Sequence, residues 1–128
     1  MVVVHFADMS DILRTPEMSR RYRAHRESGA MDHGCVLCSA AAIQTFQYWK
    51  IINNDFPYDR IATVHHMIIP LRHVREDGLT AAEQAEFRTI KQGELQKYDY
   101  IFEPTDHQRS IPDHYHAHLM VAREQLGE

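Results

Sequence analysis

The segment from residue 114 to residue 120 constrains this chain most, because it alternates histidine with other residues inside an apolar run. It reads His114-Tyr115-His116-Ala117-His118-Leu119-Met120. In an extended strand, successive side chains point to opposite faces, so the three histidines share one face of a sheet. Each two-residue step covers about 6.5 Å, so the outer two histidines lie about 13 Å apart and cannot bind one ion together. We therefore expect the three imidazoles to have different roles.

The size and charge of the chain restrict its class. Its 128 residues are enough for one domain around one hydrophobic core. The formal net charge of −4 comes from interspersed signs, so we expect binding neither to nucleic acid nor to an anionic membrane. The apolar start at residues 1–6 is too short for a secretory signal, and no run approaches the roughly 20 apolar residues of a membrane span. We therefore expect a cytoplasmic protein with no membrane segment.

Two segments carry the start signals of helices. Thr15-Pro16-Glu17 places an N-cap, a proline at the first helical position and an acid in the first turn, and Gly29 supplies the end. The capping box Thr80-Ala81-Ala82-Glu83 begins a second helix, which we expect to reach about Lys97. The first helix is expected to have a solvated basic face, and the alternative is a phosphate-contacting role for one of its arginines. These are Arg14, Arg20, Arg21, Arg23 and Arg26.

Several segments have the composition of strands. Ala42–Asn53 is rich in Ile, Phe, Tyr and Trp, and a second strand runs through Ile61–Ile69 to Pro70. Tyr98–Glu103 is a further candidate, and the histidine strand ends at about Ala122. Short connections favour antiparallel pairing. The sequence therefore predicts an α+β fold, a single domain with a mostly antiparallel sheet and helices packed on one side.

The two cysteines of the chain, Cys35 and Cys38, form a Cys-x-x-Cys pair. In a reducing compartment this spacing indicates a metal or redox site, and metal is favoured because the pair does not follow a strand and precede a helix in the thioredoxin manner. Tetrahedral zinc needs two more ligands, and a shell closed by four protein ligands is structural. Spacing does not choose among the candidate histidines, and a metal-free pair of buried thiols is the alternative. The candidates are His33, His66, His73 and His114.

The middle histidine of the alternating segment, His116, has neighbours on its own face that can hold phosphate oxygens. A neutral imidazole is an effective nucleophile at phosphorus near pH 7, provided that its other nitrogen is held by an acceptor that selects the tautomer. The competing interpretation is a catalytic ion bound by His-x-His ligands. That site needs a supporting carboxylate or histidine, and Glu124 lies past the expected end of the strand. We therefore expect His116 to be the nucleophile.

Together these segments resemble the histidine triad superfamily of nucleotide hydrolases and transferases. The triad segment fits the signature of that superfamily at every position. Asn54-Asp55-Phe56-Pro57-Tyr58 is similar to its Asn-x-Phe-Pro-Tyr ribose loop, and residues 66–73, which read His-Met-Ile-Ile-Pro-Leu-Arg-His, are similar to its strand that runs from a histidine to Pro-x-x-His. The similarity covers about residues 35–122. It implies a single domain over residues 1–128, with an N-terminal helical extension at 1–34 and the core at 35–122.

The resemblance implies an activity and roles for individual residues. His116 would attack the α-phosphorus of a nucleoside phosphate derivative, and water or another acceptor would resolve the nucleotidyl-histidine. Asn54 would bind the ribose hydroxyls, while Gln108, Ser110 and His118 would hold phosphate oxygens or assist the leaving group. The expected function is therefore a nucleotide hydrolase or nucleotidyl transferase. The alternative is a non-catalytic nucleotide-binding module of the same fold.

The zinc-bearing branch of the superfamily supplies the expected cofactor. Its ion is held by a Cys-x-x-Cys, by the histidine after the proline-containing strand and by the first triad histidine. In this sequence these positions are Cys35, Cys38, His73 and His114, and they would bind a structural Zn²⁺. The resemblance alone also implies a homodimer.

Overall fold

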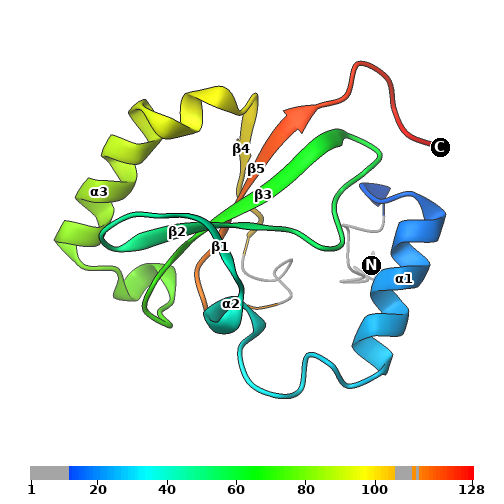
Figure 1. Cartoon of the computed structure of the whole chain (residues 1–128), viewed down its shortest axis with the longest axis horizontal. Helices are drawn as coiled ribbons and strands as arrows, with labels where there is room; N and C mark the ends of the chain where they lie inside the picture. Colours follow the sequence, from blue (N-terminus) through cyan, green and yellow to red (C-terminus); the bar gives the residue numbers. More distant parts are fainter. Residues whose placement is uncertain (1–11, 106–110, 112) are drawn as a thin grey trace, which may run out of the picture.

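Five strands form one antiparallel sheet at the centre of the protein, in a computed structural model that describes residues 12–105, 111 and 113–128. The strand order is β1-β2-β3-β5-β4, so β3 and β5 lie in the middle of the sheet (Figure 1). All four strand pairs are antiparallel. The strands are β1 Ala42–Thr45, β2 Trp49–Asn53, β3 Ala62–Pro70, β4 Tyr100–Phe102 and β5 Ala117–Ala122.

The segment Ala42–Asn53 is a hairpin, so the prediction of one continuous strand was wrong. The backbone N–H of Phe46 donates to the carbonyl oxygen of Trp49 at 2.7 Å, which turns the chain between β1 and β2. No Gly, Pro, Asn or Asp lies at this turn, so the usual turn chemistry was absent from the sequence. The two strands of the hairpin differ in burial: β1 is mostly exposed, whereas Trp49 at the start of β2 is fully buried.

The two long helices begin at the positions that we predicted from their capping residues. α1 (Pro16–Glu27) has Thr15 as its N-cap, and the Thr15 Oγ1 atom accepts a hydrogen bond from the N–H of Met18. α3 (Ala81–Gln92) has the complete capping box. It ends at Gly93, earlier than predicted, and a short 3₁₀ helix, η3 (Glu94–Lys97), follows. Shorter helical segments among the described residues include α2 (Val36–Ser39) and the 3₁₀ helix η2 (Glu76–Gly78).

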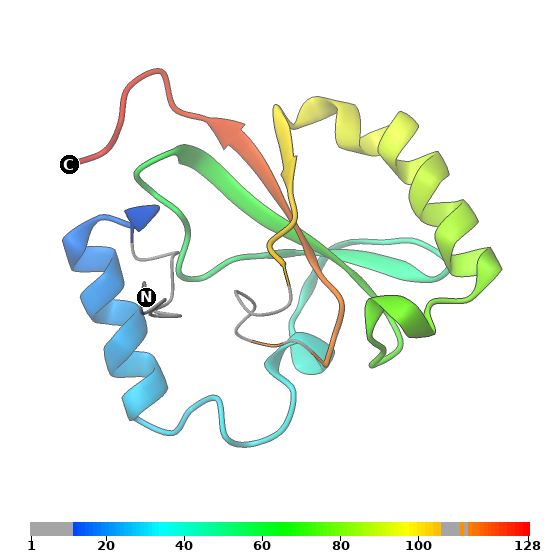
Figure 2. The same ribbon diagram turned by 180° about the vertical axis from the view of Figure 1, so that it is seen from behind.

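The two faces of the sheet have different roles, because side chains alternate along each strand. On one face, Trp49, Ile68 and Leu119 pack with Ile90 of α3 and Leu95 of η3 into the main hydrophobic core. The opposite face carries a smaller core beside α2, made of Leu37, Ile52 and Ile69. The α+β fold with a mostly antiparallel sheet is confirmed. α3 covers one face as predicted, whereas α2 packs on the other, and α1 lies at the opposite end of the sheet from α3 (Figures 1 and 2).

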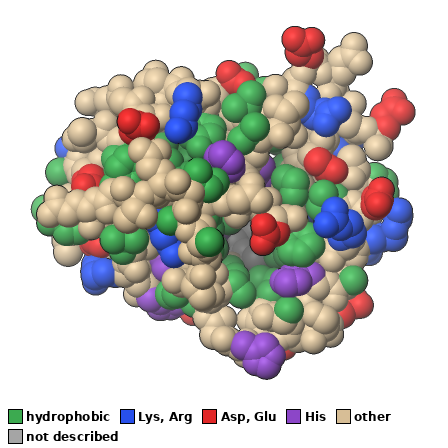
Figure 3. Space-filling model, in the orientation of Figure 1, with side chains coloured by type: hydrophobic (Ala, Val, Ile, Leu, Met, Phe, Trp, Pro, Cys, Tyr) green, Lys and Arg blue, Asp and Glu red, His purple; other side chains and the backbone are tan. Residues whose placement is uncertain are grey.

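The surface has no large region of a single charge on the face that Figure 3 presents. Basic and acidic side chains are interspersed there, including over α1. In the part of the chain that the structure describes, no helix has the length and apolar content that crossing a membrane requires.

Candidate functional site

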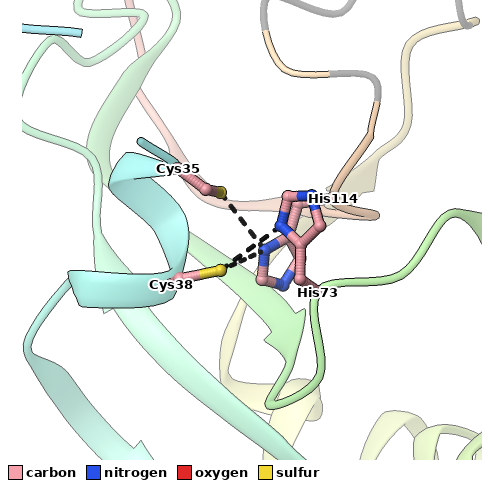
Figure 4. Close-up of side chains that lie close together, drawn as sticks. All are labelled: Cys35, Cys38, His73 and His114. Atoms are coloured by element: carbon pink, nitrogen blue, oxygen red, sulfur yellow. Dashed lines mark hydrogen bonds between the residues drawn. The ribbon is translucent and has the colours of Figure 1, made fainter. Parts of the chain in front are cut away.

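Two cysteines and two histidines converge at one corner of the sheet (Figure 4). Cys35 and Cys38 lie at the start of α2 and within it, His73 follows β3, and His114 precedes β5. Their candidate ligand atoms all lie within 4.8 Å of one another. The Nδ1 atom of His114 is 3.4 Å from each sulfur, and the Nδ1 atom of His73 is 3.3 Å from the sulfur of Cys38. These four residues could therefore bind a metal ion.

The ring of His114 shows why this arrangement suits a cation. Its Nε2 atom lies 2.9 Å from the carbonyl oxygen of Pro70, which can only accept, so Nε2 carries the hydrogen and Nδ1 presents a lone pair. Both sulfurs face this one lone pair. A single lone pair cannot accept strong hydrogen bonds from two S–H groups, so hydrogen bonding alone does not account for the arrangement. Burial and the neighbouring Cys35 raise the pKa of the Cys38 thiol, so a bound cation would be needed to hold both sulfurs as thiolates. The S···N distances are close to the roughly 3.6 Å edge of a tetrahedral zinc site.

The structure separates the four candidate histidines of the sequence. His73 and His114 lie at the cysteine pair. His66 points to the other face of the sheet, where its Nδ1 atom lies 2.7 Å from the hydroxyl oxygen of Tyr98. His33 is exposed and lies outside the cluster. That these four residues are metal ligands stays a prediction, since their proximity alone does not identify an ion.

A cavity of about 170 Å³ opens on the histidine face of the sheet, and His116 and His118 are among its lining residues. His116 is only 6 % exposed, and its Nδ1 atom lies 3.0 Å from the backbone carbonyl oxygen of His114. Because a carbonyl only accepts, Nδ1 donates its hydrogen and the lone pair resides on Nε2. The ring lies outside the cysteine and histidine cluster. It therefore has the tautomer that a nucleophilic imidazole requires.

A chain of hydrogen bonds selects the tautomer of His118. The backbone N–H of Tyr58 donates to Nδ1 of His65 at 2.9 Å, so the neutral ring of His65 carries its hydrogen on Nε2. That Nε2 lies 2.7 Å from Nδ1 of His118, which accepts, and His118 consequently carries its hydrogen on Nε2. Burial, followed by the charge of Arg14, lowers the pKa of His65 to about 3, so this ring stays neutral near pH 7. His118 is therefore a donor and His116 carries an acceptor nitrogen.

The predicted ribose residue, Asn54, lines the same cavity. Its Oδ1 atom accepts from the N–H of Phe56 at 2.9 Å, which is the local bond of an Asx turn. Its amide nitrogen lies 3.4 Å from Nε2 of His65. The structure thus brings Asn54, His116 and His118 together. The predicted phosphate residues Gln108 and Ser110 lie outside the described residues.

Sequence reasoning missed His65, which is 3 % exposed and contacts His118 directly. The signal was present in the His65-His66 doublet, because adjacent residues of a strand point to opposite faces and one of the two had to share the face of the triad. The register of β3 against β5 decides which. It pairs His65 with Met120 and Met67 with His118, and this places His65 and His118 diagonally on one face.

Comparisons with known proteins support the fold. No family model matches the chain, and no curated protein matches it significantly. A solved histidine triad protein from Clostridium difficile matches with a TM-score of 0.51 and 16% sequence identity, over 73% of this chain and 94% of that one. Another solved structure, described as a Hit Like Protein, matches with a TM-score of 0.46 and 16% identity, over 64% and 85% of the two chains. The match to the Clostridium difficile protein shows that this chain has the histidine triad fold, as the sequence resemblance implied.

Proposed function

We propose that this protein is a nucleotide hydrolase or nucleotidyl transferase that acts through covalent catalysis by His116. The observation that carries the proposal is the position of this ring, which lines a cavity while its Nδ1–H is engaged by the His114 carbonyl. A neutral imidazole held in this way has its nucleophilic nitrogen selected before substrate binds, so no reorientation is needed at the moment of attack.

The reaction then has two displacements at phosphorus. In the first, the lone pair of His116 Nε2 forms a bond to the α-phosphorus as the bond to the leaving group breaks. In the second, water or another acceptor attacks the same phosphorus and the bond to Nε2 breaks, which restores the neutral ring. His118 is assigned as the donor to a phosphate oxygen or to the leaving group, because His65 directs its hydrogen onto Nε2. Asn54 is assigned to the ribose hydroxyls.

We assign Zn²⁺ to the cluster of Cys35, Cys38, His73 and His114. Four protein ligands would complete a tetrahedral shell, so the ion would contribute to folding and would leave no coordination position for substrate. Among the common cellular cations, zinc is the one best suited to a site made of two thiolates and two imidazoles. The ion would connect α2, the segment after β3 and the segment before β5. Assembly as a homodimer and a cytoplasmic location stay predictions.

Turnover tests the nucleophile directly. Wild-type protein and His116→Asn are incubated with adenosine phosphoramidate and with an aminoacyl-adenylate, and AMP release is measured. Asparagine keeps an N–H for the His114 carbonyl but has no nucleophilic nitrogen, so we expect the rate to fall by about 10³-fold or more. His33→Asn is the matched control, because His33 is exposed and lies outside the cavity.

Two results would count against the proposal. Equal rates for wild type and His116→Asn would exclude the covalent step. Calorimetric binding of AMP by a wild-type protein that turns over no nucleotide would instead favour the non-catalytic binding module. A nucleotidyl adduct on wild-type protein quenched at alkaline pH, absent from His116→Asn, would support the proposal independently of the rates.

A further inference from the structure

The segment that precedes α1 is tied to the loop that carries Asn54. The backbone N–H and the hydroxyl of Thr15 both donate to the carboxylate of Asp59 at 2.8 Å. The N–H of Arg60 donates to the carbonyl oxygen of Leu13 at 3.1 Å. These contacts hold the start of α1 against residues 54–60, and α1 contributes Tyr22 and His25 to the wall of the cavity. Helix α1 thus forms part of the wall of the cavity.

Arg14 is buried at this junction, with only 5 % of its surface exposed. Its Nε atom donates to the carbonyl oxygen of Phe56 at 2.9 Å. Its guanidinium carbon lies 4.2 Å from the ring centroid of Tyr22 and 4.9 Å from that of Tyr58. A carbonyl and two aromatic rings therefore fix the position of a side chain that is always charged. Other arginines of this region are exposed, namely Arg20, Arg21, Arg23 and Arg26.

The buried charge of Arg14 belongs to the cavity that two of the triad histidines line. Arg14 lines the same cavity as His116 and His118, and among the described lining residues it is the single Lys or Arg. The ring of Tyr58 contacts both groups, since it also packs on His65 at 4.5 Å and on His118 at 5.1 Å between centroids. A guanidinium is the side chain best suited to bind a phosphate, because its paired donors match two oxygens. Burial would strengthen that attraction.

We propose that Arg14 binds a phosphate group of the nucleotide in this cavity, so that α1 and the segment before it form part of the substrate site. The inference rests on the proposed nucleotide specificity but not on turnover. A purely structural role, in which Arg14 only docks α1 on the Phe56 loop, predicts a different result. Docking affects every ligand of the cavity, whereas a phosphate contact affects only phosphorylated ligands.

Calorimetric titration with AMP and with adenosine separates the two roles. The measured quantity is the selectivity, defined as the Kd of adenosine divided by the Kd of AMP. In Arg14→Gln we expect AMP to bind about 10-fold to 100-fold more weakly, with the Kd of adenosine unchanged within about 2-fold, because one charge-assisted contact is lost. Arg20→Gln, which replaces an exposed arginine of the adjoining helix α1, is the matched control and should keep the wild-type selectivity.

The outcomes are distinct. Selectivity lowered in Arg14→Gln and kept in Arg20→Gln supports the proposal, whether or not the protein turns nucleotides over. Equal weakening of both ligands, or no change in either, overturns it and leaves the proposed function intact. A wild-type protein that binds neither ligand overturns both. If Arg14→Gln does not fold, Arg14→Lys replaces it. An ammonium lacks the paired donors, so the selectivity should fall several-fold, and an unchanged value overturns the proposal.

Discussion

The neutral state of His65 makes a quantitative prediction about stability and pH. Burial lowers the pKa of this ring from 6.5 to about 3, and the charges of Arg14 and His66 act in the same direction. Between these two values the unfolded chain binds a proton on this residue and the folded protein does not. Unfolding is therefore favoured as the pH falls from about 6.5 towards 3, and the stability that the neutral ring provides above pH 6.5 is progressively lost. Replacing His65 with glutamine removes this dependence.

The size of the effect follows from the two pKa values. Each unit of difference corresponds to about 1.4 kcal/mol, so lowering the pH from 7 to 4.5 should cost the wild type about 2.5 kcal/mol through this one group. His65→Gln is expected to be less stable at pH 7, because the Tyr58 N–H and the His118 Nδ1 lose well-placed partners, at about 1–3 kcal/mol each. Its stability should nevertheless fall less between pH 7 and pH 4.5 than that of the wild type.

Urea denaturation followed by fluorescence provides the assay. The single tryptophan of the chain, Trp49, is fully buried in the main core and reports unfolding. The free energy of unfolding is measured at pH 7 and pH 4.5 for wild type, His65→Gln and the exposed control His33→Gln. Titrating groups that do not contact His65 or His33 contribute nearly equally to all three proteins and cancel in the comparison. If wild type and His65→Gln lost the same free energy on acidification, the inferred neutral ring and the relay to His118 would both be refuted.

Two further predictions concern the metal cluster and the start of α3. Elemental analysis of protein purified without chelators should find about one zinc per chain, and chelation should lower the melting temperature by roughly 10 °C or more, because structural zinc contributes directly to folding. His73→Ala should lose the metal and His33→Ala should keep it, so metal-free wild-type protein would contradict the assignment. Glu83→Gln should destabilise the protein by about 1–3 kcal/mol in urea at pH 7, since the Glu83 carboxylate accepts from the Arg72 guanidinium at 2.7 and 3.0 Å and from the Thr80 N–H at 2.8 Å. The hydrogen bonds from Arg72 are the main reason why the pKa of Glu83 is lowered to about 2, so this stability should disappear as the pH falls from about 4.5 towards 2. If Glu83→Gln lost as much free energy of unfolding as the wild type over this pH range, the prediction would be contradicted.

Features that depend on local chemistry were predictable from the sequence. The capping residues Thr15 and Thr80 placed the starts of both long helices, because an N-cap satisfies backbone donors within its own first turn. The alternation after His114 survives in the structure, although the hydrogen-bonded strand β5 begins only at Ala117. Tyr115 packs in the main core while the triad histidines lie on the opposite face. A shift of one residue would exchange the two faces of this strand. Because both faces of the sheet are buried, the alternating pattern therefore fits only one register.

Features that depend on pairing between distant segments were decided by the tertiary structure. Residues 65 and 66 are equivalent histidines in the sequence, and only the pairing of β3 with β5 assigns one to the cavity and the other to Tyr98. The sequence likewise does not distinguish among the arginines around α1. Only the docking of that helix buries Arg14 in the cavity that His116 and His118 line. Side-chain direction along a strand or helix is a local property that a sequence encodes residue by residue. Which of two opposite faces meets a cavity depends on contacts between residues some 50 positions apart, and these exist only once the chain has folded.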